Sequence, residues 1–239
     1  MGNFVTKLGS LWIKVLSNDS QLDTIFTKEV SMSVSKFIFP SLLLLLIHSS
    51  SAWAYLSFAE SAEIMPAGRY QVGFEPQLLT NRGNGANFNL FFDANVNDDT
   101  SARVTMGAGA IDFNAFASVK YIPFPDVGNQ PAMGLRAGAG VSRDEGENLL
   151  TAQLAPMLSK KFNTEYGMSV PYLAIPFNFV NSKEENYVGS NVVFGTEFHS
   201  KDAQNFIFGA EIGAELSKSY SYISAFITIP FDSSKGFGK

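Results

Sequence analysis

The chain of 239 residues contains no cysteine, which excludes disulfide bonds and the lipidation of an N-terminal cysteine. Charges are also few: 16% of the residues are Asp, Glu, Lys or Arg, and the net charge is −5. An acidic chain of this kind is not expected to bind nucleic acid. Long apolar runs are missing after residue 54, so no membrane-spanning helix is expected there. Yet 46% of the residues are hydrophobic, so the apolar residues must follow another pattern.

One apolar run near the N-terminus has the features of a signal peptide. Lys36 supplies a positive charge, five consecutive leucines (42–46) form the apolar centre, and Ala52 and Ala54 are the small residues of a cleavage site. We therefore expect residues 32–54 to be a signal peptide that is removed by cleavage after Ala54. The alternative is an N-terminal membrane anchor, for which the apolar run is short.

Residues 1–31 precede this signal, although export signals normally begin at the first residue. Two explanations stay open. Either translation starts at Met32 and the upstream start is misassigned, or residues 1–31 are an extended n-region. In both cases residues 55–239 remain as the mature chain, which is long enough for one domain.

The mature chain alternates apolar and polar residues, and residues 86–97 show this most clearly. One face of this segment carries Phe88, Leu90, Phe92, Ala94 and Val96, and the other carries Asn87, Asn89, Asp93, Asn95 and Asn97. Side chains alternate across a strand with period two, so the segment is predicted to be a strand with one apolar and one polar face.

Similar segments recur along the mature chain and are separated by turn residues such as those at 97–100 and 144–146. We expect ten strands, at 68–79, 86–97, 101–110, 112–123, 131–142, 148–160, 169–180, 187–198, 204–216 and 220–231. Proline cannot donate to a β-ladder. Four prolines within these segments therefore mark bulges or strand ends, and they leave counts of eight to twelve open: Pro76, Pro156, Pro171 and Pro176.

The predicted fold is all-β: a single antiparallel up-and-down transmembrane β-barrel formed by residues 55–239. Strands of about ten residues can cross a bilayer when tilted, and an even strand number is typical of such barrels. The alternative is a soluble periplasmic barrel that turns its apolar face inward around an apolar ligand. The export signal and the even count favour the membrane barrel, with lipid on the apolar face.

The polar face is then the lumen, which is rich in Gly, Asn and Ser and carries charges of both signs. A ten-stranded barrel is narrow, so we expect these charges to pair across the lumen and close it, or to leave a thread for water and small ions. Glycines 107, 109, 138 and 140 mark positions where a plug, a large neighbour or a water path fits. The predicted charge network consists of Arg69, Glu75, Asp93, Arg103, Asp112, Lys120, Arg136, Glu197, Glu211 and Glu215.

These features resemble the small outer-membrane β-barrel proteins of Gram-negative bacteria. The resemblance rests on the alternating strands, the Gly-Ala runs at 107–110 and 138–140, and the last strand at 222–231. It implies an outer-membrane location, contact with outer-membrane lipid and lipopolysaccharide, and insertion by the barrel-insertion machinery. The insertion signal would comprise Tyr222, Ile227, Ile229 and Phe231, although residues 232–239 and Pro230 depart from the usual pattern.

Candidate reactive residues are scarce. His199 shares its face with Glu197, and Glu211 and Glu215 lie on the polar face of the next strand, so a metal or acid–base site is conceivable. A charge network or a turn histidine is the plainer interpretation. Ser200 adjoins His199, but adjacent residues of a strand point to opposite faces. A hydrolase pair would require one face.

We therefore expect no enzyme activity, no metal and no cofactor. A structural or surface-interaction role ranks first, and a small passive pore for ions or small polar solutes ranks second. An outer-membrane lipid-modifying enzyme and the soluble barrel follow. The sequence leaves the oligomeric state open.

Overall fold

In a computed structural model, residues 57–81, 84–183, 185–232 and 236–237 are described. The expected signal peptide, with Ala52 and Ala54, and residues 1–31 lie outside this part of the chain. Among the described residues, no helix is long and apolar enough to cross a membrane.

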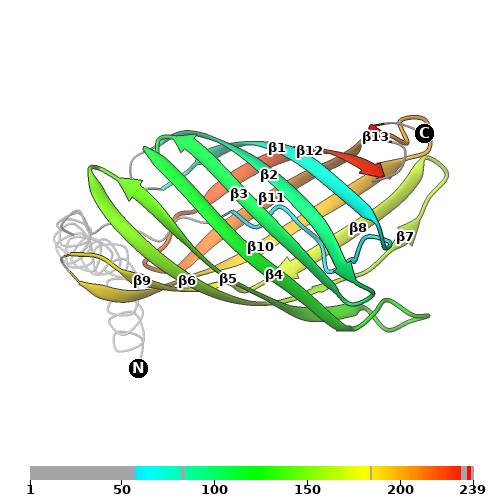
Figure 1. The fold of residues 1–239 in the computed structure, drawn as a ribbon, viewed down its shortest axis with the longest axis horizontal. Coiled ribbons are helices and arrows are strands. Elements are labelled where there is room, and N and C mark those ends of the chain that lie inside the picture. The colour runs from blue at the N-terminus through cyan, green and yellow to red at the C-terminus, as the bar shows by residue number, and fades with distance from the viewer. Residues whose placement is uncertain (1–56, 82–83, 184, 233–235, 238–239) are drawn as a thin grey trace, which may run out of the picture. The chain divides into compact units, whose positions relative to one another are not determined.

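The described residues form one antiparallel sheet that closes on itself, because the last long strand pairs with the first (Figure 1). Its strands are β1 (Arg69–Leu79), β2 (Gly85–Asn97), β3 (Thr100–Gly109), β4 (Phe113–Phe124), β5 (Ala132–Asp144), β6 (Glu147–Ser159), β7 (Phe162–Asn163), β8 (Gly167–Ala174), β9 (Phe177–Asn181), β10 (Asn186–Ser200), β11 (Ile207–Ser217), β12 (Tyr222–Asp232) and β13 (Gly236–Phe237). The strands β8 and β9 are two halves of one crossing, since both lie between β6 and β10. The barrel thus has ten crossings, as predicted, and β7 and β13 are short extra strands.

The prolines lie where the ladders tolerate a missing donor. Pro76 has a partner in β2 but none in β12. Pro176 lies in the break between β8 and β9, where its carbonyl still accepts a hydrogen bond from Asn191 N at 3.3 Å. The carbonyls of Pro156 and Pro171 likewise accept bonds from neighbouring backbone N–H groups. The predicted strand 169–180 is therefore interrupted, but the wall stays closed.

The apolar faces point outward. Large apolar side chains such as Leu78, Leu90 and Phe194 are more than half exposed. An apolar surface that covers a whole wall is unfavourable in water. The polar faces point inward: Asn87, Asn89 and many other polar side chains are buried in the lumen. A soluble barrel needs the opposite orientation, so this alternative is wrong.

Several inward positions hold an aromatic ring over a glycine of the next strand. A Cβ added to Gly73 would lie 2.0 Å from Phe91 Cζ, so only glycine leaves room for that ring. The ring of Phe116 covers both Gly138 and Gly140, so a large neighbour occupies these positions. The remaining pairs are Tyr172 over Gly195, Phe226 over Gly209 and Tyr222 over Gly213.

The last crossing, β12, presents Ile227, Ile229 and Phe231 on the outward parity. Tyr222 instead points inward and is 2% exposed. The ring of Phe231 stacks on Tyr70 of β1, with centroids 5.6 Å apart. These outer aromatics lie at the end of the barrel where β1 begins and β12 ends.

Candidate functional site

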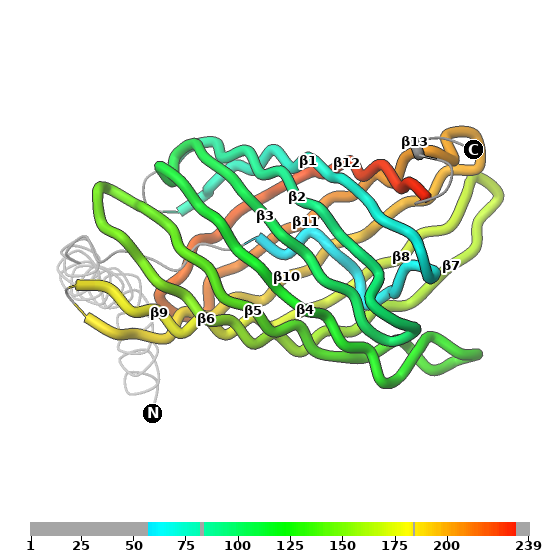
Figure 2. Tube along the Cα trace, viewed as in Figure 1, coloured from blue at the N-terminus to red at the C-terminus, as the bar shows by residue number. Residues whose placement is uncertain are grey.

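The segment before β1 folds back into the lumen, as the blue tube in Figure 2 shows. We call residues 57–66 the luminal segment. Phe58, Ala59, Glu60, Ser61 and Ala62 are each at most 4% exposed. The segment has no regular secondary structure, so its backbone groups must find partners on the barrel wall.

Glu60 of the luminal segment lies among three cations from three neighbouring strands. Its carboxylate is 3.1 Å from Lys120 Nζ of β4, 3.1 Å from Arg136 Nη1 of β5 and 4.0 Å from Arg103 Nη2 of β3. All four side chains are buried. A buried charge is tolerated only when it is paired. The carboxylate of Glu60 therefore offsets part of the positive charge that Lys120, Arg136 and Arg103 bring into the lumen.

The same cations also bind the carbonyl groups of the luminal segment. Arg103 donates to the carbonyls of Phe58 and Ala59 at 3.0 Å each, and Arg136 donates to that of Phe58 at 3.0 Å. Lys120 donates to the carbonyls of Ser61 and Glu63 at 2.8 and 2.7 Å. The wall formed by β3, β4 and β5 thus supplies donors to the segment.

The opposite wall supplies acceptors. Glu211 of β11 accepts hydrogen bonds from the backbone N–H groups of Phe58 and Ala59 at 3.2 and 2.7 Å. Glu197 of β10 accepts one from Ser61 N at 2.7 Å. Cations therefore bind the carbonyls and carboxylates bind the amides, so the charge of each wall matches the backbone polarity it meets.

Further contacts fix these carboxylates. The hydroxyl groups of Tyr172 and Tyr222 both donate to Glu211 at 2.5 Å. Glu75 accepts from Ser57 Oγ at 2.6 Å and from Asn89 Nδ2 at 3.1 Å. The two inward tyrosines thus serve both as rings over glycines and as hydrogen-bond donors.

The remaining predicted network residues lie elsewhere. Asp93 pairs with Arg103 in the lumen. Arg69 is largely exposed and lies 3.8 Å from Asp232 at the barrel end, and Asp112 is exposed in the turn before β4. Glu215 accepts from Asn81 at 2.7 Å near the opposite end.

His199 Nε2 lies 3.4 Å from Glu197 Oε2. The hydroxyl oxygen of Ser200 accepts bonds from the backbone N–H groups of Asp202 and Ala203, so it belongs to the turn after β10. Within the described part of the chain, no group of three His, Cys, Asp or Glu side chains is arranged to hold a metal ion.

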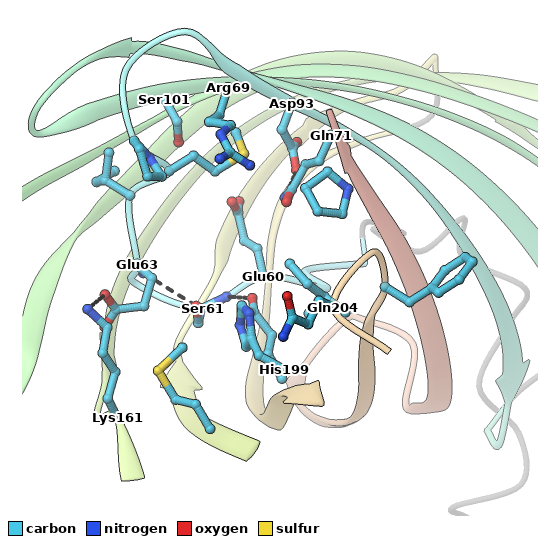
Figure 3. A pocket seen from close by; sticks show the side chains of 18 of the residues that line it. Glu60, Ser61, Glu63, Arg69, Gln71, Asp93, Ser101, Lys161, His199 and Gln204 are labelled. Carbon is cyan, nitrogen blue, oxygen red and sulfur yellow. Dashed lines mark hydrogen bonds and ion pairs between the residues drawn. The ribbon is translucent and has the colours of Figure 1, made fainter. Parts of the chain in front are cut away.

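A cavity of about 380 Å³ opens at the end of the lumen where β1 begins and β12 ends. Its lining includes Glu60, Asp93, Gln71, Glu63 and His199 (Figure 3). Because Glu60 and Ser61 are among the lining residues, the cavity reaches the luminal segment. We call it the vestibule.

Two turns at this end hold the segment in place. Glu63 lies 2.5 Å from Lys161 Nζ, and Asp126 of the β4–β5 turn accepts from Lys160 Nζ and from Lys161 N at 2.5 and 2.7 Å. Burial pushes the pKa of Asp126 upward, but these hydrogen bonds and the two lysine charges outweigh it, so the pKa lies below its ordinary value.

Sequence reasoning missed Glu60 and the luminal segment, because residues 57–66 have no periodicity that assigns them to a face. It also missed the inward aromatics Phe91 and Phe116. Their signal was available: each is an aromatic on the polar parity of a strand, opposite a glycine-bearing neighbour.

A closed ten-crossing antiparallel barrel with an apolar exterior and a polar interior defines a transmembrane β-barrel of the outer-membrane class. No family model matches the chain, and no curated protein matches it.

Among solved structures, the chain is similar to the translocator domain of the autotransporter NalP from Neisseria meningitidis, at 12% identity over 71% of this chain and 90% of that one, with a TM-score of 0.45. LpxR from Salmonella typhimurium matches at 11% identity over 62% and 74% of the two chains, with a TM-score of 0.40. The attachment invasion locus protein Ail of Yersinia pestis matches at 12% identity over 70% and 100%, with a TM-score of 0.24. These neighbours are outer-membrane β-barrel proteins.

Proposed function

We propose that this protein is a sealed outer-membrane barrel with a structural or surface-interaction role, closed by its own luminal segment. The observation that carries the proposal is the position of Glu60 between Arg103, Lys120 and Arg136. The segment is held through side chains and through its backbone on both walls, which leaves little room for solute in mid-lumen.

The five connections at the end where β1 ends and β12 begins are short: they cover residues 80–84, 110–112, 145–146, 182–185 and 218–221. Long outer loops are the usual carriers of recognition in such barrels. The surface available for interaction is therefore mainly the outer wall and its rims.

Planar-bilayer conductance tests the sealed state. The wild-type protein is expected to show no steps above baseline. Glu60→Arg places a fourth cation among three, so it is expected to displace the segment and produce steps. Glu60→Gln is a milder second variant, with shorter and rarer openings expected. Lys218→Gln is the control, because Lys218 forms an exposed pair with Glu185 at 2.7 Å away from the lumen.

A small passive pore is the second candidate, and the vestibule favours it because it already opens the lumen as far as Glu60. Stable steps from the wild-type protein that change on Arg136→Gln or Glu211→Gln would support the pore and contradict the sealed barrel. Silence in wild type and steps in Glu60→Arg would support the sealed barrel.

We also propose that the protein is not an enzyme and that β12 serves the insertion machinery. The turn contacts of Ser200, which do not involve His199, support the first statement. His199→Ala is therefore expected to leave the lipid composition of the membrane unchanged. The outward Ile227, Ile229 and Phe231 support the second, and polar replacements there are expected to reduce the yield of inserted barrel.

A further inference from the structure

A groove of about 910 Å³ lies on the outer wall, near the rim formed by the β5–β6 and β9–β10 turns. Its apolar lining includes Phe113 of β4, Val141 of β5 and Leu150 of β6, all exposed. Arg143 and Lys183 complete it on the side of the rim. The groove thus combines an apolar floor with a cationic edge.

The two cations are free for a ligand. Arg143 and Lys183 are both exposed, and neither forms an ion pair with another described residue. Lys218, at the same end of the barrel, is instead 2.7 Å from Glu185. Arg143 also stands on the outward parity of β5, next to Val141 on the same face. Its charge therefore projects toward the surroundings of the barrel and away from the lumen.

The height of Arg143 on the wall matches the edge of the apolar belt. The step from Met133 to Arg143 measures roughly 33 Å along the strand, or about 25 Å along the barrel axis at the usual strand tilt. The apolar band of such barrels is about 25 Å tall. Arg143 therefore lies where lipid headgroups begin, while Val141 and Leu150 lie at acyl-chain depth.

We propose that this groove binds an anionic, phosphate-bearing membrane lipid. The phosphate lies between Arg143 and Lys183, and an acyl chain covers Val141 and Leu150. Guanidinium and ammonium groups are the usual donors to phosphate oxygens, and basic clusters at membrane surfaces select anionic lipids. The proposal rests on the membrane location of the barrel and not on the sealed lumen, so a conducting wild-type protein would leave it unaffected.

Native mass spectrometry of the detergent-solubilised full chain tests the proposal, with phosphatidylglycerol and phosphatidylcholine as probes. The wild-type protein is expected to retain phosphatidylglycerol in preference to phosphatidylcholine. Each cation contributes about fivefold in affinity, so Arg143→Gln with Lys183→Gln is expected to weaken retention by roughly 25-fold. Lys218→Gln, the matched control, is expected to retain the lipid as wild type does.

A competition experiment with inorganic phosphate distinguishes a lipid site from a site for a soluble anion. Displacement of phosphatidylglycerol by an equal concentration of phosphate would mean that the site takes a soluble anion, and the lipid proposal would be wrong. Equal retention by wild type and the double variant, or of both lipids by wild type, would also overturn it. A mobility shift between unboiled and boiled samples verifies that each variant is folded.

Discussion

Asp93 of β2 and Arg103 of β3 are cross-strand partners and form a bidentate ion pair inside the barrel. Arg103 Nε lies 2.5 Å from Asp93 Oδ1, and Arg103 Nη2 lies 2.7 Å from Asp93 Oδ2. Both side chains are about 5% exposed. The pair thus presents to the luminal segment a guanidinium whose orientation is already fixed, with its Nη1 directed at the carbonyls of Phe58 and Ala59.

Asp93→Asn is expected to lower the free energy of unfolding by about 3–5 kcal/mol, because it leaves Arg103 buried without its main partner. Urea unfolding in detergent, followed by the loss of the fast-migrating band, measures the effect. Asp232→Asn removes the exposed partner of Arg69 and is expected to change stability by less than about 1 kcal/mol. Equal losses in both variants would contradict this assignment.

Glu60→Gln and Glu75→Gln form a matched pair of substitutions at buried carboxylates. Glu60 lies within 4.0 Å of three buried cations, so its loss is expected to destabilise the barrel by about 3–5 kcal/mol. Glu75 is fully buried, forms no ion pair with a described residue, and accepts hydrogen bonds from the neutral groups of Ser57 and Asn89. Removing that charge is expected to leave the free energy of unfolding unchanged or to raise it. The midpoints of thermal unfolding in detergent distinguish the two variants. A larger decrease of the midpoint in Glu75→Gln than in Glu60→Gln would contradict this expectation.

Gly73→Ala is expected to destabilise the barrel, because its Cβ would lie 2.0 Å from the ring of Phe91. Overpacking of this kind costs about 1–3 kcal/mol. Phe91→Ala alone is also destabilising, but in its background Gly73→Ala should cost little. A double-mutant cycle measures the coupling, and additive losses would show that the ring does not depend on this glycine.

Asp126, in the β4–β5 turn, makes the free energy of unfolding depend on pH. Because its pKa in the folded state is lowered, its contribution is present above the ordinary aspartate value of about 3.9 and disappears as the pH falls through the lowered pKa. Wild type is therefore expected to be more stable than Asp126→Asn at pH 7, and the difference should vanish in strong acid. A difference that grows on acidification would reverse the sign and exclude the pairing with Lys160.

The alternating pattern, together with the export signal, predicted ten crossings and the face of most side chains, because a strand has only two faces. It failed for Tyr222, which was grouped with the outward residues of the last strand but points inward. It could not place Glu60, since an irregular segment carries no parity. The exposed position of Asp112 was equally hidden: it depends on β4 beginning at Phe113, one residue after the predicted start at 112. Strand ends are decided by hydrogen-bond partners that a single sequence does not display. The break at Pro176 was visible as a proline but not as the division between two strands.

The luminal segment has a mechanical consequence for the barrel. It is bonded to β3, β4 and β5 on one side and to β10 and β11 on the other. These strands lie across the cylinder from one another, so the segment is an internal brace that fixes the diameter. Lateral pressure in the bilayer tends to flatten a cylinder, and a segment bonded to both walls opposes that change. The luminal segment, which is not part of any strand, thereby helps to maintain the cross-section of the barrel.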